Sequence, residues 1–134
     1  MRRTMTTTAL VFALILSALP AYAHNSNGPG VSYPAPSGCA SGALCVYDGH
    51  QFLGNKFQFF GTNNSWGAWA INNNDESAYN NGTSGLDVRV YDLTSYSGQL
   101  QYCLRKGRGY KFLDSTLGAD HDDDGSSNIW GNYC

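Results

Sequence analysis

Two short runs of acidic, amide and hydroxyl side chains could bind a metal cation. One run is residues 73–78 (NNDESA), and the other is residues 122–127 (DDDGSS). Each run has two acid or amide residues, a two-residue spacer and then a hydroxyl. Calcium prefers six to eight oxygen ligands, and carboxylate, amide and hydroxyl oxygens all serve. We therefore predict paired calcium-binding loops, with ligands Asn74, Asp75 and Ser77 in the first loop and Asp123, Asp124 and Ser126 in the second.

A second interpretation of both runs remains open. Asp, Asn and Ser side chains also cap the backbone of ordinary solvated turns, without any cation. An EF-hand that begins at Asp120 is a weaker alternative, because its twelfth position is Gly131, where a bidentate glutamate is needed. No flanking helices are predicted for it either.

The first 23 residues have the features of a secretory signal peptide. Arg2 and Arg3 are basic, residues 9–19 (ALVFALILSAL) are apolar, and Ala21 and Ala23 fit the small-residue cleavage rule. The apolar run is too short to span a bilayer comfortably. We expect cleavage after residue 23, which leaves 111 of the 134 residues as a secreted, extracellular chain with no membrane partner.

The mature chain is acidic. Without Arg2 and Arg3, six Lys and Arg residues face ten Asp and Glu residues, a net charge of −4. Binding to nucleic acid needs a net basic face, so this class of partner is not expected. A chain of this length forms one domain of common size, and we expect a monomer.

The four cysteines of an exported chain predict two disulfides. Cys39, Cys45, Cys103 and Cys134 allow three pairings, and the sequence does not choose between them. We favour Cys39–Cys45 and Cys103–Cys134, because local loops close easily.

The mature chain has the pattern of an all-β domain behind a flexible leader. Residues 24–38 are rich in Gly, Pro, Ser and Asn and predict the leader, so the folded part should start near Cys39. No sustained helical stripe follows. Short β-favouring runs recur instead, at residues 44–47, 56–60, 86–91 and 100–104, and turn-forming residues separate them.

An aromatic–glycine pattern occurs twice at the same spacing. Tyr47-x4-Phe52-x-Gly54 matches Tyr91-x4-Tyr96-x-Gly98, with an offset of 44 residues. We expect an aromatic ring to lie over the turn of a folded hairpin, where a Cβ would clash and a positive φ is required. The cation-binding runs align at an offset of 49, with Ser77 opposite Ser126. Two units of this size can bury a face only by packing against each other.

These residues together resemble the βγ-crystallin superfamily. The resemblance covers about residues 39–134 and implies a double Greek-key β-sandwich with one repeat at about 44–85 and another at about 86–134. More narrowly, residues 39–47 (CASGALCVY) look like the opening of secreted bacterial βγ-crystallin-like domains grouped with the SMPI-type metalloproteinase inhibitors.

The calcium motif of the superfamily is (N/D)(N/D)xx(S/T)S. The second loop satisfies every position, whereas the first has Ala78 in place of the final serine. In the family the two loops exchange ligands, so each ion needs both units. We therefore expect Ca²⁺ as a bound ion and the first loop as the weaker half.

The resemblance implies a peptidase inhibitor, with an extracellular metalloendopeptidase as its partner. Such an inhibitor needs a rigid loop, and the sequence offers residues 40–44 with the apolar Leu44, or the segment around Cys103 and Leu104. Two alternatives are a calcium-stabilised extracellular binding or structural module and a small secreted antimicrobial or toxin-like protein. No G-x-S-x-G or H-E-x-x-H motif occurs, so enzymatic activity is not expected.

Overall fold

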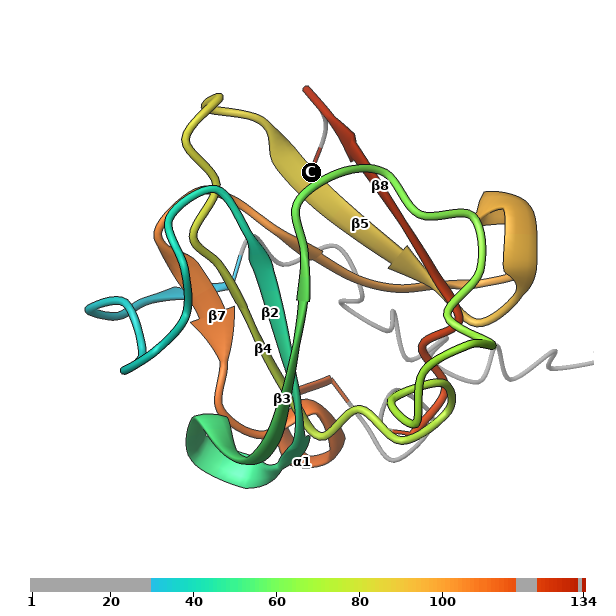
Figure 1. The fold of residues 1–134 in the computed structure, drawn as a ribbon, viewed down its shortest axis with the longest axis horizontal. Helices are drawn as coiled ribbons and strands as arrows, with labels where there is room; N and C mark the ends of the chain where they lie inside the picture. The colour runs from blue at the N-terminus through green and yellow to red at the C-terminus, as the bar shows by residue number, and fades with distance from the viewer. Residues whose placement is uncertain (1–29, 118–122, 133) are drawn as a thin grey trace, which may run out of the picture.

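Two antiparallel sheets make up most of the fold (Figure 1). The computed structural model describes residues 30–117, 123–132 and 134. The predicted signal peptide, the first part of the predicted leader and Asp122 lie outside the described residues. The strands are β1 (Val31–Ser32), β2 (Leu44–Gly49), β3 (Leu53–Phe59), β4 (Ser77–Asn80), β5 (Asp87–Tyr91), β6 (Leu100–Leu104), β7 (Arg108–Tyr110) and β8 (Ser127–Gly131).

Each half of the chain gives a segment to the sheet of the other half. The first sheet has the order β1-β7-β4-β2-β3, so β7 from the second half pairs with β4 from the first. The second sheet has the order β6-β5-β8, and Asn63 from the first half bridges to Asn128 on β8. This exchange ties the two halves into one unit, as the predicted double Greek key requires, and the all-β fold class is confirmed.

The two aromatic–glycine hairpins have the same backbone conformation. The short 3-10 turn η1 (His50–Phe52) joins β2 to β3, and η2 (Thr94–Tyr96) joins β5 to β6. Gly54 and Gly98 have φ of +80° and +75°, so the predicted positive φ is confirmed.

We expected an aromatic ring to exclude a Cβ at these two glycines, and this expectation is wrong. A Cβ at Gly54 would meet the carboxylate of Asp48, not an aromatic ring, and a Cβ at Gly98 would meet Asp92. Each carboxylate folds over its glycine to accept a hydrogen bond from the next backbone N–H, at 2.6 Å for Asn55 in the first hairpin and 2.7 Å for Gln99 in the second.

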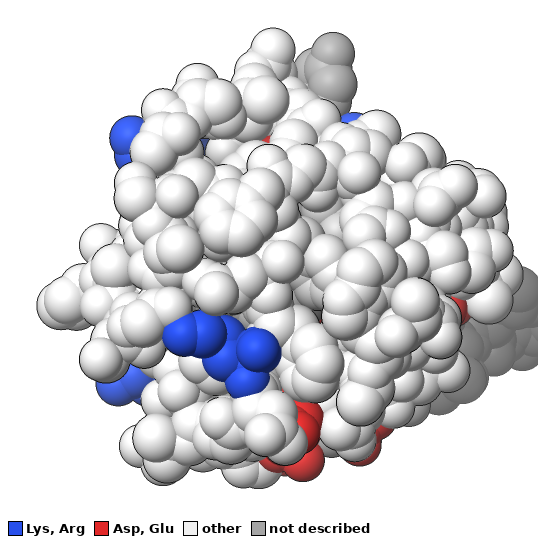
Figure 2. All heavy atoms as spheres, viewed as in Figure 1, with Lys and Arg blue, Asp and Glu red and all other residues white. Residues whose placement is uncertain are grey.

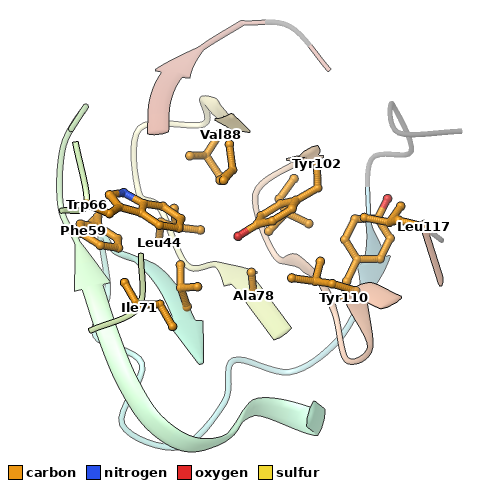
Figure 3. Close-up of a cluster of buried hydrophobic side chains, with 13 residues drawn as sticks. Leu44, Phe59, Trp66, Ile71, Ala78, Val88, Tyr102, Tyr110 and Leu117 are labelled. Carbon is orange, nitrogen blue, oxygen red and sulfur yellow. The ribbon is translucent and has the colours of Figure 1, made fainter. Parts of the chain in front are cut away.

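One hydrophobic core lies between the sheets (Figure 3). The alternation along β5 buries Val88 and Val90, as the sequence predicts. Trp66 is fully buried and stacks on Phe59, with ring centroids 4.8 Å apart and planes 3° apart. The short helix α1 (Leu113–Leu117) covers one end of the core with its two leucines.

The predicted start of the folded part at Cys39 is wrong. Val31 and Ser32 form β1, which pairs with β7 at the edge of the first sheet. The Tyr79 hydroxyl donates a hydrogen bond to the Tyr33 carbonyl at 2.9 Å. The Gly- and Pro-rich composition suggested a leader, but strand pairing at Val31 and Ser32 and hydrogen bonds to Gly30, Tyr33 and Gly38 hold residues 30–38 on the domain.

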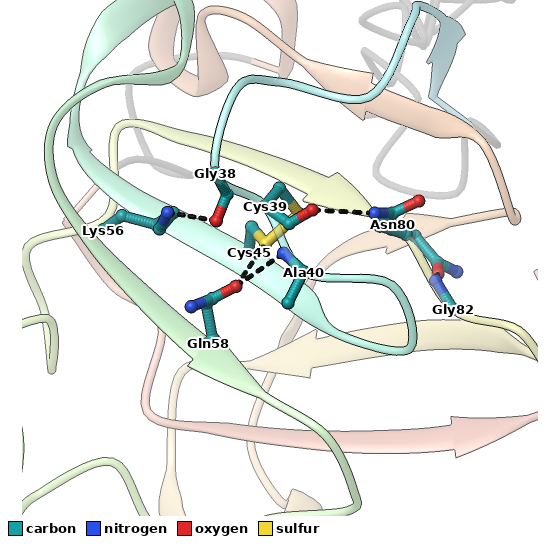
Figure 4. Close-up of a disulfide and its surroundings, with 9 residues drawn as sticks. Gly38, Cys39, Ala40, Cys45, Lys56, Gln58, Asn80 and Gly82 are labelled. Atoms are coloured by element: carbon teal, nitrogen blue, oxygen red, sulfur yellow. Dashed lines mark hydrogen bonds between the residues drawn. A yellow bond between two sulfur atoms is a disulfide. The ribbon is translucent and has the colours of Figure 1, made fainter.

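Both predicted disulfides are present, Cys39–Cys45 and Cys103–Cys134. The first closes a small loop beside β2 and β3 (Figure 4). There the Gln58 side-chain oxygen accepts a hydrogen bond from the Ala40 N–H at 2.7 Å, and the Lys56 ammonium donates to the Gly38 carbonyl. The second disulfide ties the chain end to β6.

Candidate functional site

The two predicted calcium loops lie against each other. The Asn73 N–H donates to the Gly125 carbonyl at 2.9 Å, and the Asp123 N–H donates to the Asp75 carbonyl at 3.0 Å. Asn73 and Asp123 also share a left-handed backbone, with φ of +53° and +57°. These two contacts align Asn73 with Asp123 and Asp75 with Gly125, an offset of 50 residues. The sequence predicted two facing loops, but with an offset of 49.

The register of the first loop is therefore corrected by one residue. Ser77 pairs with Tyr47 in the first sheet, whereas Ser127, not Ser126, pairs with Tyr91 in the second. The Ser77 hydroxyl donates to the Gly49 carbonyl at 2.6 Å and accepts from the Phe52 N–H at 3.0 Å. Ser77 is buried and structural, which contradicts its assignment as the hydroxyl equivalent to Ser126.

The Ser127 hydroxyl makes the matching contacts in the second half. It donates to the Leu93 carbonyl at 2.6 Å and accepts from the Tyr96 N–H at 3.2 Å. The first loop has a single serine, so a sequence alignment pairs it with either of the two adjacent serines in the second loop. Only the hydrogen bonds to the hairpins decide between them.

Asp75 faces the protein interior. Its carboxylate is fully buried, accepting the Gly125 N–H at 2.7 Å and the Tyr102 hydroxyl at 2.9 Å. Burial raises the pKa of Asp75 to about 7, although both hydrogen bonds act in the opposite direction. Burial also raises the pKa of Tyr102 well above its usual value. Asp75 thus joins the two halves, and both of its oxygens are engaged.

Ser126 contacts the first loop directly through its side chain. Its hydroxyl donates to the Asn73 side-chain oxygen at 2.7 Å. Asn74 in the first loop and Asp123 and Asp124 in the second are exposed. All these donors are oxygens, the type calcium prefers. The residues present fit calcium in part, since Asp75 and Ser77 are engaged elsewhere.

The position equivalent to Ser126 in the first loop is Glu76, and sequence reasoning missed its partners. The Glu76 carboxylate lies 2.8 Å from Nε2 of His50, and Asp114 lies 3.6 Å from the same nitrogen. The first loop therefore has a carboxylate at the position where the second loop has a hydroxyl. Within the described residues, no three His, Cys, Asp or Glu side chains gather as a metal-binding group.

The side chains of Leu44, Cys103 and Leu104, in the two segments predicted to present an inhibitory loop, are buried, whereas Ser41 in the first segment and Arg105 and Lys106 beside the second are exposed. Leu44, Cys103 and Leu104 have no exposed surface, so none can enter the cleft of a peptidase in this conformation. Leu44 lies on β2 and Leu104 on β6, where their side chains fill the core. The large apolar side chains that are exposed lie elsewhere, at Val31, Leu53, Phe60, Trp69 and Leu93.

A family model decides the identity of the chain. The model of peptidase inhibitor family I36 matches residues 32–103, more than half of the sequence. The chain belongs to peptidase inhibitor family I36. This membership shows that the protein is a peptidase inhibitor with a βγ-crystallin fold, that a peptidase is its partner, and that it is not an enzyme.

Solved structures confirm the fold. One solved structure comes from work on the evolution of the eye-lens βγ-crystallin domain fold and is 17% identical to this inhibitor. The match covers 78% of this inhibitor and 96% of the other chain, with a TM-score of 0.59. A βγ-crystallin from Ciona intestinalis is 22% identical, with coverage of 66% and 99% and a TM-score of 0.55. An archaeal βγ-crystallin is 21% identical, with coverage of 68% and 99% and a TM-score of 0.53.

No curated protein matches this inhibitor in sequence. In the described part of the chain, no helix has the length and apolar character needed to cross a membrane.

Proposed function

We propose that this member of family I36 is a secreted, monomeric inhibitor of metalloendopeptidases. The observation that carries the proposal is the family match over residues 32–103, together with the opening at residues 39–47 that resembles SMPI-type inhibitors. Secretion is supported by the signal-peptide pattern of residues 1–23 and by the two disulfides, which persist in oxidising compartments.

The architecture suits an inhibitor because it limits movement. An inhibitor binds tightly when its contact surface is already shaped for the cleft, since less conformational entropy is lost on binding. Here each half gives a segment to the sheet of the other half. The Cys39–Cys45 disulfide fixes the start of β2, and the Cys103–Cys134 disulfide fixes residue 134 to β6. The surface loops are therefore held on a rigid framework.

A panel assay tests the target class. Residues 24–134 are incubated with a thermolysin-like zinc endopeptidase, a subtilisin-like serine peptidase and a trypsin-like serine peptidase, each at nanomolar concentration. The proposal predicts inhibition of the zinc enzyme at micromolar inhibitor or below. Inhibition of a serine peptidase alone would keep the family function and contradict the metalloendopeptidase assignment.

Calcium binding by the paired loops is a second part of this proposal. Ser126 and Asn73 would hold the ion together with carboxylate oxygens of the second loop, and bound calcium would fix the two loops against each other. The supporting observations are the oxygen-only donor set and the contact of 2.7 Å between Ser126 and Asn73. An ion that binds only the folded state adds about 2.7 kcal/mol of stability at a hundredfold excess over its Kd.

A further inference from the structure

The first aromatic–glycine hairpin carries an exposed apolar side chain that its fold does not need. Leu53 follows η1 directly, and 64% of it is exposed. The residue at the same place in the second hairpin is Ser97, whose hydroxyl donates to the Thr94 carbonyl at 2.6 Å. The two residues have the same backbone conformation, with φ of −105° and −106°. Because the turn forms equally with a serine, the hairpin itself does not require a leucine.

Leu53 lines a pocket of about 310 Å³. The hairpin contributes Phe52 and Leu53 to its lining, and the segment before β2 contributes Tyr33 and the prolines at positions 34 and 36. In Figure 1, η1 is the short coil at the lower left that joins β2 to β3. The lining is therefore largely apolar, as in most pockets that bind small ligands.

The aromatic part of this lining is held in place by the fold. The ring of Phe52 packs against Tyr33, Tyr47 and Tyr79, with centroid separations of 5.6, 5.7 and 5.9 Å. The Tyr79 hydroxyl donates to the Tyr33 carbonyl at 2.9 Å, and the Phe52 N–H donates to the Ser77 hydroxyl at 3.0 Å. The pocket is thus formed before any ligand arrives, so little ordering is needed on binding.

Among the lining residues that the structure describes, Lys111 alone is charged. Its ammonium lies 4.7 Å from the centroid of the Tyr33 ring, within the range of a cation–π contact. In the described part of the chain no carboxylate forms an ion pair with it, and the carboxylates of Glu76 and Asp114 lie against His50 instead. The pocket therefore holds a positive charge for which these residues supply no counter-charge.

This positive charge is local and does not belong to a broad basic surface. Figure 2 shows one face of the molecule in the view of Figure 1, and most of that face carries no charged side chain. The mature chain as a whole has a net charge of −4. The protein therefore has no general attraction for anions, and an anion that binds must be recognised at a particular site.

Two uncharged polar side chains also line the pocket. Ser37 and Gln51 are exposed, and within the described residues neither side chain makes a hydrogen bond. A hydroxyl and a primary amide can each donate and accept, so together they match the N–H and C=O of a peptide group. The lining thus offers partners for one carboxylate, one peptide group and one apolar side chain.

We propose that this pocket binds the carboxyl-terminal residue of a peptide whose last side chain is apolar. The Lys111 ammonium would pair with the terminal carboxylate, and the apolar side chain would lie against Phe52 and Leu53. Ser37 and Gln51 would bond the last peptide group. A volume of about 310 Å³ is at the small end for ligand pockets, which suits a single terminal residue. This site is additional to peptidase inhibition and does not depend on it.

NMR titration of the ¹⁵N-labelled 24–134 chain at low ionic strength tests the ligand class. The probes are N-acetyl-leucine, its amide, which lacks the carboxylate, and 4-methylpentanoate, which lacks the peptide group. N-acetyl-leucine should bind with a Kd in the low millimolar range or below, and the shifts should centre on residues 51–53 and Lys111. The other two probes should bind at least about fivefold more weakly, because each loses one set of hydrogen bonds.

Two variants with matched controls test the residues. Lys111→Gln should weaken binding of N-acetyl-leucine by about fivefold or more, whereas Lys106→Gln, the same charge change at an exposed turn, should leave it within about twofold. Leu53→Ser should weaken binding by about threefold or more, and Leu93→Ser, at an exposed position in the other hairpin, should not. Thermal melts verify that each variant is folded.

The outcomes decide each part of the inference. Shifts spread over unrelated surfaces, or no saturation at tens of millimolar, would overturn the site. Equal binding of N-acetyl-leucine and its amide would overturn the role of the charge, and this comparison on the wild type still decides if Lys111→Gln melts lower. Equal binding of 4-methylpentanoate would identify the ligand as a free apolar acid and overturn its assignment as a peptide end.

Discussion

The carboxyl of Asp75 and the hydroxyl of Tyr102 form a buried hydrogen bond of 2.9 Å that joins the two Greek-key halves. Asp75 comes from the loop before β4, and Tyr102 lies on β6 in the other sheet. The carboxyl also accepts the Gly125 N–H of the second loop. One side chain therefore links both calcium-loop candidates to the core, and its protonation should govern the stability of the domain.

Stability should fall as pH rises from about 4 to about 7. In the unfolded chain Asp75 loses its proton near its ordinary pKa of 3.8, whereas in the folded protein burial raises the pKa to about 7. Between these values the folded state binds more protons, so the contribution of Asp75 to stability is complete at low pH and is lost as pH rises through 7. The loss amounts to a few kcal/mol, because a tenfold change in proton affinity corresponds to about 1.4 kcal/mol.

Chemical denaturation at several pH values measures this effect. Asp75→Asn keeps an acceptor for the Gly125 N–H and cannot ionise. The unfolding free energy of the variant minus that of the wild type should therefore increase from pH 4 to pH 7 and then stay constant. A difference that does not change with pH would show that Asp75 ionises as easily in the folded protein as in the unfolded chain.

Ser77→Ala and Ser127→Ala should destabilise the domain by similar amounts. Each hydroxyl joins a carbonyl and an N–H of its hairpin, and loss of a buried partner costs about 1–3 kcal/mol. Ser115→Ala, at an exposed position in α1, is the matched control and should change stability by less than about 0.5 kcal/mol. Thermal melts in EGTA check all three. A neutral Ser77→Ala would refute the corrected register.

Ser126→Ala should remove the stabilisation by calcium without lowering stability in EGTA by more than about 1 kcal/mol. The Ser126 hydroxyl contacts Asn73 across the two loops, whereas the Ser77 hydroxyl contacts a hairpin. Ser77→Ala should therefore show the opposite behaviour, with lower stability in EGTA and an unchanged rise with calcium. Melts with millimolar calcium or magnesium measure this. A wild-type chain that calcium does not stabilise would leave the loops as capped turns.

The two disulfides should contribute unequally. Cys103–Cys134 spans 31 residues and Cys39–Cys45 spans 6. Loop-closure entropy predicts about 4 kcal/mol for the longer loop and about 2 kcal/mol for the shorter. Urea unfolding of Cys103→Ala/Cys134→Ala and of Cys39→Ala/Cys45→Ala compares them. A larger loss for the 39–45 pair would mean that its packing beside β2, rather than loop closure, determines its contribution.

The sequence predicted those features that depend on local chemistry. The glycines at positions 54 and 98 need a positive φ, and the alternation at Val88 and Val90 needs a half-buried strand, so both could be seen in the residues alone. The favoured pairing of Cys39 with Cys45, six residues apart, followed from the ease of local closure. These features require no knowledge of which distant segments meet.

The sequence could not predict features that depend on contacts between distant residues. Asp75 looks like a calcium ligand until Tyr102, 27 positions away, is found against it. Leu44 looks like an exposed loop residue until β2 is placed between β3 and β4. The Gly- and Pro-rich composition of residues 24–38 likewise gave no indication of β1, because its pairing partner β7 lies far along the chain.

The most direct test of the central claim is an active-site titration of a thermolysin-like zinc endopeptidase with the 24–134 chain. Enzyme at a concentration well above the expected Kd is mixed with increasing inhibitor, and the residual cleavage of a small peptide substrate is recorded. Peptidase inhibition predicts a linear fall in activity that ends near one equivalent of inhibitor. Unchanged activity at a hundredfold excess, with the chain recovered intact and folded, would contradict the claim that this protein inhibits metalloendopeptidases.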